Sequence, residues 1–124
     1  MHEEILQIIE AEPELGPEHP DVATTLNNLA ALYYNMGDYE QALPLYQRAL
    51  DISEKVLGPH HPSVATSLNN LAGLYRHMGD YDKALPLFQR ALDIREKVLG
   101  PQHADVATSL NNLALLYHHM GDYE

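Results

Sequence analysis

The sequence predicts an all-α protein, an α-solenoid of stacked antiparallel helix hairpins. Residues 17–58 and 59–100 match without a gap at 32 of 42 positions, and residues 101–124 match the second copy at 18 of 24. Within each copy the apolar residues recur with the period of one helical face, and single glycines and prolines separate the two helical stretches. Because a helix pair cannot bury its apolar face alone, the copies are expected to stack on one another as a single domain.

The amino-acid composition excludes several kinds of site and several classes of binding partner. The chain has 124 residues, no cysteine, and 18 acidic against 7 basic side chains, giving a net charge of −11. It therefore forms no disulfide and no thiolate metal site, and the acidic balance argues against nucleic acid or anionic lipid as a partner. No apolar run approaches the roughly 20 residues that span a bilayer, and the start lacks a basic, apolar leader. We expect a cytoplasmic protein.

Residues 1–16 are predicted to form a capping helix and turn. Residues 1–12 are interpreted as a shortened second helix of an earlier unit, because the Leu15-Gly16-Pro17 ending matches the ends of both full copies. Four apolar residues lie among the glutamates of this segment: Ile5, Leu6, Ile8 and Ile9.

Each 42-residue unit is predicted to begin with one helix and a glycine turn. In the second copy Pro62 suits the first helical turn, Gly79 the left-handed position after the helix, and Asp80 the N-cap of the next helix. The apolar face of this first helix is expected to consist of Val64, Leu68, Leu71, Ala72, Tyr75 and Met78.

The second helix of this unit is predicted from about Tyr81 to Val98, ended by Gly100-Pro101. Asp93 and Lys97 form an i, i+4 ion pair near its end. Its apolar residues are Ala84, Leu87, Phe88, Ala91, Leu92 and Leu99. Pro44 and Pro86, inside the second helices of the two copies, are expected to bend them.

The third unit, residues 101–124, contains only a first helix. Without a second helix it is expected to expose an apolar strip larger than a stable monomer shows. Either the chain is a fragment of a longer array, or another copy covers the strip, so that the protein is a homo-oligomer. The candidate assembly surface consists of Ile5, Leu6, Ile9, Leu110, Leu113, Ala114 and Tyr117.

The run Leu68–Tyr75 (LNNLAGLY), followed by Gly79-Asp80-Tyr81, Ala84 and Phe88, resembles a tetratricopeptide repeat. The 42-residue spacing more closely resembles the kinesin light chain and nephrocystin-3 type, and the near-identity of the copies also resembles bacterial tandem arrays and consensus designs. The resemblance covers residues 17–124. It implies a right-handed superhelix whose first helices line a concave, peptide-binding face. The short first segment, Ala104 in place of proline and the truncated last unit depart from the family pattern.

A polar face recurs on the three first helices. Asparagine is a poor residue for a helix interior, so two in succession in every copy call for an explanation. One interpretation is a ladder of amides that binds the backbone of an extended peptide, as the resemblance implies, with Asn27, Asn69 and Asn111 in contact with the ligand. The other is that one asparagine of each pair bonds to a neighbouring helix. The candidate residues are Asn27, Asn28, Ala31, Tyr34, Asn35, Asn69, Asn70, Gly73, Arg76, His77, Asn111, Asn112, Leu115, His118 and His119.

Three substitution series separate the copies on this polar face, while the apolar face scarcely changes. Pockets of differing size and charge on a common frame are what side-chain selectivity requires, although drift at exposed positions produces the same pattern. The series are Ala31/Gly73/Leu115, Tyr34/Arg76/His118 and Asn35/His77/His119.

The sequence predicts no enzyme, no metal and no cofactor. His77, His118 and His119 lack zinc-ligand spacing, no GxSxG turn occurs, and the glycines are single rather than clustered in a phosphate loop. The leading hypothesis is a protein-interaction scaffold that holds a peptide or partner helix of unknown identity in its concave groove. The alternatives are a self-assembling structural element and a sensor segment of a larger signalling protein.

Overall fold

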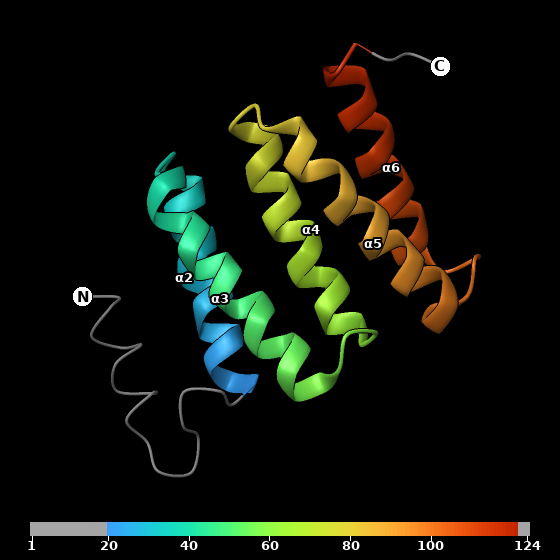
Figure 1. The fold of residues 1–124 in the computed structure, drawn as a ribbon, viewed down its shortest axis with the longest axis horizontal. Coiled ribbons are helices and arrows are strands. Elements are labelled where there is room, and N and C mark those ends of the chain that lie inside the picture. The colour runs from blue at the N-terminus through green and yellow to red at the C-terminus, as the bar shows by residue number, and fades with distance from the viewer. Residues whose placement is uncertain (1–19, 122–124) are drawn as a thin grey trace. The chain divides into compact units, whose positions relative to one another are not determined.

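The computed structural model describes residues 20–121, and all the regular structure within that range is helical. The helices are α2 (Pro20–Asn35), α3 (Tyr39–Leu57), α4 (Pro62–His77), α5 (Tyr81–Leu99) and α6 (Ala104–His119) (Figure 1). The predicted all-α class is confirmed. The expected helix at residues 1–12 lies outside the described residues. None of the helices in the described range is long and apolar enough to cross a membrane.

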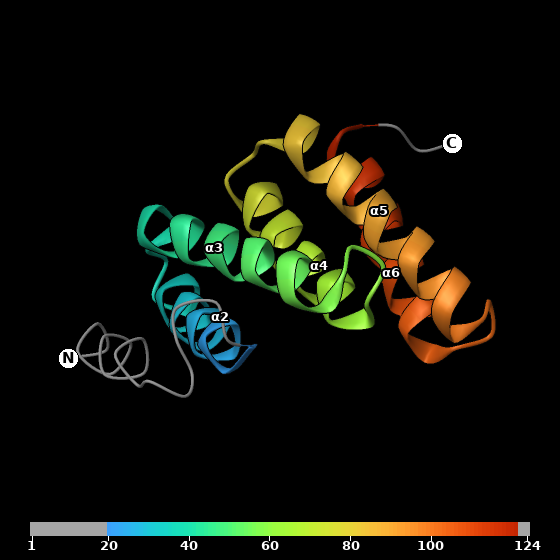
Figure 2. The same ribbon diagram turned by 60° about the horizontal axis from the view of Figure 1, so that its bottom comes forward.

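The chain divides into two compact units, Met1–Pro59 and His60–Glu124. In the described part of the first unit, α2 packs against α3, and the two helices lie side by side in Figures 1 and 2. Tyr33 and Leu45 pack at the margin of its core. That core consists of Val22, Ala23, Leu26, Leu29, Ala49 and Ile52.

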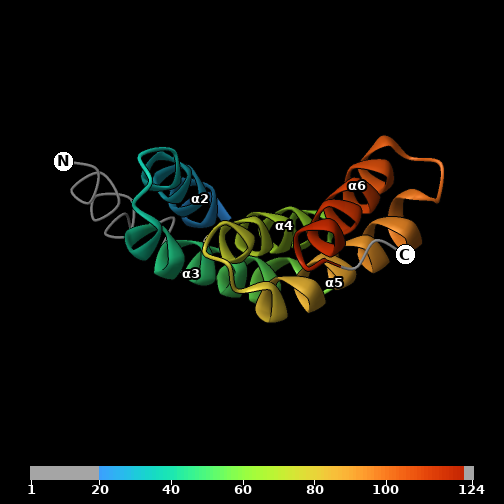
Figure 3. The same ribbon diagram turned by 90° about the horizontal axis from the view of Figure 1, so that it is seen from above.

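In the second unit, α5 packs against both α4 and α6. Figure 3 shows α4 and α6 on the same side of α5, and Figure 1 shows them running in the same direction. Because α4 and α6 run in the same direction, equivalent residues of these two first helices lie at the same end of the unit. The largest fully buried side chain is Phe88 of α5.

Local signals place the helix ends where the sequence predicts them. α4 begins at Pro62 and α5 at Tyr81, and Gly79 between them has a φ of +80°. Asp80 occupies the N-cap of α5, but its carboxylate pairs with Lys83 at 3.5 Å instead of accepting a backbone hydrogen bond. The predicted pair of Asp93 with Lys97 forms at 3.1 Å.

Two loop histidines cap first helices, a role that the sequence did not indicate. The Nδ1 atom of His61 accepts a hydrogen bond from the N–H of Ser63 at 3.0 Å, and that of His103 accepts from the N–H of Asp105 at 3.0 Å. These contacts satisfy N–H groups that have no partner within the helix.

The prediction for the apolar face of the first helix in the second copy is wrong at one position. Val64, Leu68, Leu71, Ala72 and Tyr75 are buried as predicted, but Met78 is 43% exposed. Met78 follows the last turn of α4 as its C-cap, so its side chain lies beyond the packed length of the helix.

Two glycine substitutions are expected to have opposite effects on stability. Gly100 ends α5 with φ 91° and ψ 152°, a conformation that only glycine adopts easily, so Gly100→Ala should lower the free energy of unfolding by about 1–3 kcal/mol. Gly73 lies within α4, so Gly73→Ala should raise it by about 0.5–1 kcal/mol. A Cβ atom at either position meets no atom within 4 Å, so the backbone conformation alone determines whether the alanine raises or lowers the free energy of unfolding. Urea denaturation of both variants measures the difference, and equal shifts would contradict this account.

Candidate functional site

The candidate binding residues share one property: all of them are at least partly exposed to solvent. Buried residues of the first helices, such as Leu26 and Leu68, lie on other faces. The polar face predicted from the sequence is therefore open to solvent on α2, α4 and α6, each taken by itself.

Asn69 of α4 is not a free amide. When its side-chain oxygen faces Arg95 of α5, that oxygen accepts hydrogen bonds from Nη1 at 2.5 Å and from Nη2 at 3.2 Å. The hydrogen-bonding pattern determines this orientation of the amide. Asn69 thus has the arrangement of the second interpretation, a bond to a neighbouring helix.

Arg95 also connects α5 to α6. Its Nη1 donates to Ser109 Oγ at 3.0 Å and to the backbone oxygen of Asp105 at 3.3 Å. The side chain is only 8% exposed. Burial lowers the pKa of the Arg95 guanidinium, and the negative charge of Asp105 opposes that shift. One buried cation therefore joins the three helices of the second unit.

The equivalents of Asn69 have different surroundings. In the first copy Ser53 occupies the position of Arg95 and is buried, and the Oδ1 atom of Asn27 is buried without a hydrogen-bond partner. Asn111 on α6 is exposed. The asparagine ladder predicted from the sequence is therefore not uniform.

The three substitution series lie on the partly exposed face. Tyr34 packs edge-on against Tyr39, with ring centroids 5.5 Å apart, and the ring centroids of His118 and His119 are 6.1 Å apart. The Nδ1 atom of His77 lies 2.9 Å from the backbone oxygen of Gly73.

The prediction for the candidate assembly surface is wrong at Leu113. Leu110 is 53% exposed, and Ala114 is exposed, as predicted. Leu113 is only 9% exposed, because it lies on the buried face of α6 together with Val106 and Leu116. Tyr117 is half-buried. The other members of this surface, Ile5, Leu6 and Ile9, lie outside the described residues.

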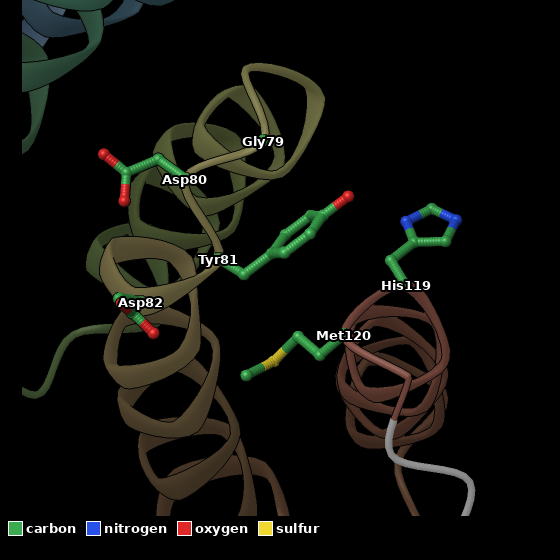
Figure 4. Close-up of a pocket in the computed structure, with 6 residues that line it drawn as sticks. All are labelled: Gly79, Asp80, Tyr81, Asp82, His119 and Met120. Carbon is green, nitrogen blue, oxygen red and sulfur yellow. The ribbon is translucent and has the colours of Figure 1, made fainter.

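A shallow depression lies where the start of α5 approaches the end of α6, with a volume of about 290 Å³. Tyr81 and His119 face each other across it, with ring centroids 6.3 Å apart, and the Met120 side chain points into the gap (Figure 4). The Asp80 side chain points away from this gap. Within residues 20–121, no three histidine, aspartate or glutamate side chains are grouped so that they could hold a metal ion.

Arg95 is the residue of this region that sequence reasoning missed. Two signals pointed to it. First, Arg95 lies on the predicted apolar face of α5, because it follows Ala91, Phe88 and Ala84 by 4, 7 and 11 positions. The change from Ser53 to Arg95 is also the substitution between the copies that adds a charge to that face.

Comparisons with known proteins agree with this architecture. A family model described as tetratricopeptide repeat matches residues 21–91 and 63–124. The crystal structure of BtubC (BKLC) from P. vanneervenii is 35% identical, with a TM-score of 0.88 over 98% of this chain and 48% of that one. The structure of a Podosopora anserina putative kinesin light chain with nearly identical TPR-like repeats is 29% identical, with a TM-score of 0.85 over 98% of this chain and 56% of that one.

The chain spans about half the length of these two proteins. A comparison with curated protein sequences found no match.

Proposed function

Because the chain belongs to the tetratricopeptide repeat family, we propose that it binds an extended peptide of a partner protein along the polar faces of its first helices. Tetratricopeptide repeats generally mediate protein–protein interaction or scaffolding. The observation that supports the finer assignment is the partial exposure of all the candidate residues on α2, α4 and α6. Asparagines in a helix interior cost stability, and an amide that is exposed to solvent, such as that of Asn28 or Asn111, is able both to donate and to accept a hydrogen bond.

Selection from a displayed library of random ten-residue peptides tests this proposal. The selected peptides should bind the full chain and lose about tenfold or more in affinity on Asn70→Ala/Asn112→Ala, because two hydrogen bonds are removed. These two asparagines are chosen because the Asn69 oxygen is already bonded to Arg95. Fluorescence anisotropy with synthetic peptides measures the change.

The matched control is Gln47→Ala/Gln89→Ala, which removes two exposed amides from α3 and α5. It should change the affinity less than twofold. Equal losses in the two double variants, or no enrichment of any peptide over a surface without the protein, would refute binding along the first helices.

A second candidate function is self-assembly. Leu110, which is 53% exposed, lies on one face of α6 with the exposed Ala114 and the half-buried Tyr117, and this apolar strip on the last described helix favours self-assembly. Leu26, the equivalent of Leu110, is fully buried in a cluster with Ala49 and Ile52 of α3. The α6 strip is therefore expected to bind an amphipathic helix that packs as α3 packs on α2. Residues 1–12 of another copy have an apolar pattern suited to this role.

A further inference from the structure

Two residues of the α6 strip are exposed although their equivalents on the other first helices are buried. Leu110 is 53% exposed, whereas Leu26 and Leu68 are fully buried. Ala114, and Ala107 one turn before Leu110 on the same face, are exposed too, although their equivalents on α2 and α4 are buried. Within the described residues, the α6 strip therefore lacks the cover that α2 and α4 have.

A second helix covers this face in each of the two complete hairpins of residues 20–121. Leu26 of α2 belongs to one core cluster with Ala49 and Ile52 of α3, and α4 packs against α5. Both second helices bury apolar residues at the same four positions, which are spaced by four, three and three residues. These residues are Ala42, Tyr46, Ala49 and Ile52 of α3, and Ala84, Phe88, Ala91 and Ile94 of α5. A helix that covers α6 in the same way needs this spacing of apolar residues.

The sequence of residues 1–12 contains this spacing in one register. Met1, Ile5, Ile8 and Ala11 are spaced by four, three and three residues. A pattern that starts at residue 2, 3, 4 or 5 instead places a glutamate on at least one of the four positions. The segment lies outside the described residues, and it is followed directly by Pro13, a residue type that ends helices. The sequence of the segment therefore fits the α6 strip in a single register.

We infer that residues 1–12 of a second copy bind the α6 strip as a helix, with Met1, Ile5, Ile8 and Ala11 directed toward it. The inference rests on the second candidate function, self-assembly, and adds the register of the contact. The segment takes the place on α6 that α5 takes on α4. Because each copy has one segment and one α6 strip, the contact joins copies head to tail.

The charges of the two elements permit this contact. The segment carries four glutamates, whereas α6 carries one acidic residue, Asp105. Glu12 takes the position of Arg95, so the contact gains none of the hydrogen bonds that Arg95 makes from α5. Burial of apolar side chains is therefore the main source of its affinity.

The register distinguishes apolar residues that are close together in the sequence. Leu6 takes the position of Gln47, which is exposed on α3, so Leu6 should face solvent while Ile8 faces the α6 strip. Ile8→Glu should weaken association of the full chain about thirtyfold, because a fully buried aliphatic side chain is lost. Leu6→Glu is the matched control and should change the association constant less than about threefold. Analytical ultracentrifugation over a range of protein concentrations measures both variants.

A gain of affinity is expected at one glutamate. Glu4 takes the position of Leu45, which packs at the margin of the α2–α3 core, so Glu4→Leu should tighten association about fivefold. Glu10 takes the position of Asp51, which is exposed on α3. Glu10→Leu makes the same change of charge and size and should alter the association constant less than about twofold. A gain of affinity does not arise from a variant that fails to fold.

An equimolar mixture of Ile8→Glu and Leu110→Glu chains tests whether the segment comes from a second copy. Each variant alone should be largely monomeric at a concentration where the unmodified chain associates. One intact segment and one intact α6 strip remain in the mixture, on different chains. The mixture should therefore form a dimer with about the affinity of the unmodified contact, and no larger species.

The outcomes separate the inference from the function on which it rests. A mixture that stays monomeric, although the unmodified chain associates, overturns the inference and leaves self-assembly through other surfaces intact. Equal effects within either matched pair overturn the register. An unmodified chain that is monomeric at every concentration overturns the second candidate function, and the inference with it.

Discussion

Replacing Arg95 with serine, the residue at the equivalent position of the first copy, is expected to lower the free energy of unfolding by about 2–4 kcal/mol. The change removes the donors to Asn69, to Ser109 Oγ and to the backbone oxygen of Asp105. Ser109 is fully buried, so its hydroxyl loses a partner that water cannot replace. Hydrogen bonds from a charged donor contribute more than neutral ones, and the loss exceeds that of an ordinary surface contact.

Chemical denaturation followed by circular dichroism measures this loss. Lys97→Ser on the same helix is the control, because its pair with Asp93 is exposed and should contribute less than about 1 kcal/mol. Arg95→Ser should also destabilise α6 locally. The amide hydrogen exchange of Ser109 and its neighbours should therefore accelerate more than that of residues in α2. A loss no greater than that of Lys97→Ser would show that Arg95 does not connect the helices.

The sequence was sufficient for the helices because their signals are local. Pro62 and Gly79 mark the ends of α4 through their own backbone preferences, and the 42-residue repeat shows that the same hairpin recurs. The polar face could also be predicted, because helical spacing alone separates Asn69 and Arg76 from the apolar residues.

What the sequence could not provide was the hydrogen-bonding state of the polar face. Whether Asn69 is free or bonded depends on Arg95, which lies in another helix and comes into reach only when α4 packs against α5. The error at Leu113 has a similar origin. The apolar residues of α6 occupy a wide arc, and its packing against α5 decides that Leu113 is buried while Leu110 is exposed.

The exposed strip on α6 leads to the second large effect, on self-association. If residues 1–12 of another copy cover the strip, Leu110→Glu should weaken association about thirtyfold, because burying a leucine contributes about 2 kcal/mol. Deleting residues 1–12 should abolish it. Analytical ultracentrifugation over a range of protein concentrations measures both effects.

Val98→Glu is the matched control for Leu110→Glu. Val98 is 49% exposed on α5, close to the 53% of Leu110, but it does not belong to the α6 strip. An isolated apolar residue on the surface of a protein is ordinary, whereas a contiguous strip indicates a docking surface. Val98→Glu should therefore leave the association constant within about twofold, whereas a head-to-tail contact through α6 loses affinity only when its own strip is altered. A monomeric wild-type chain at every concentration, or equal losses in the two variants, would exclude α6 as the assembly surface.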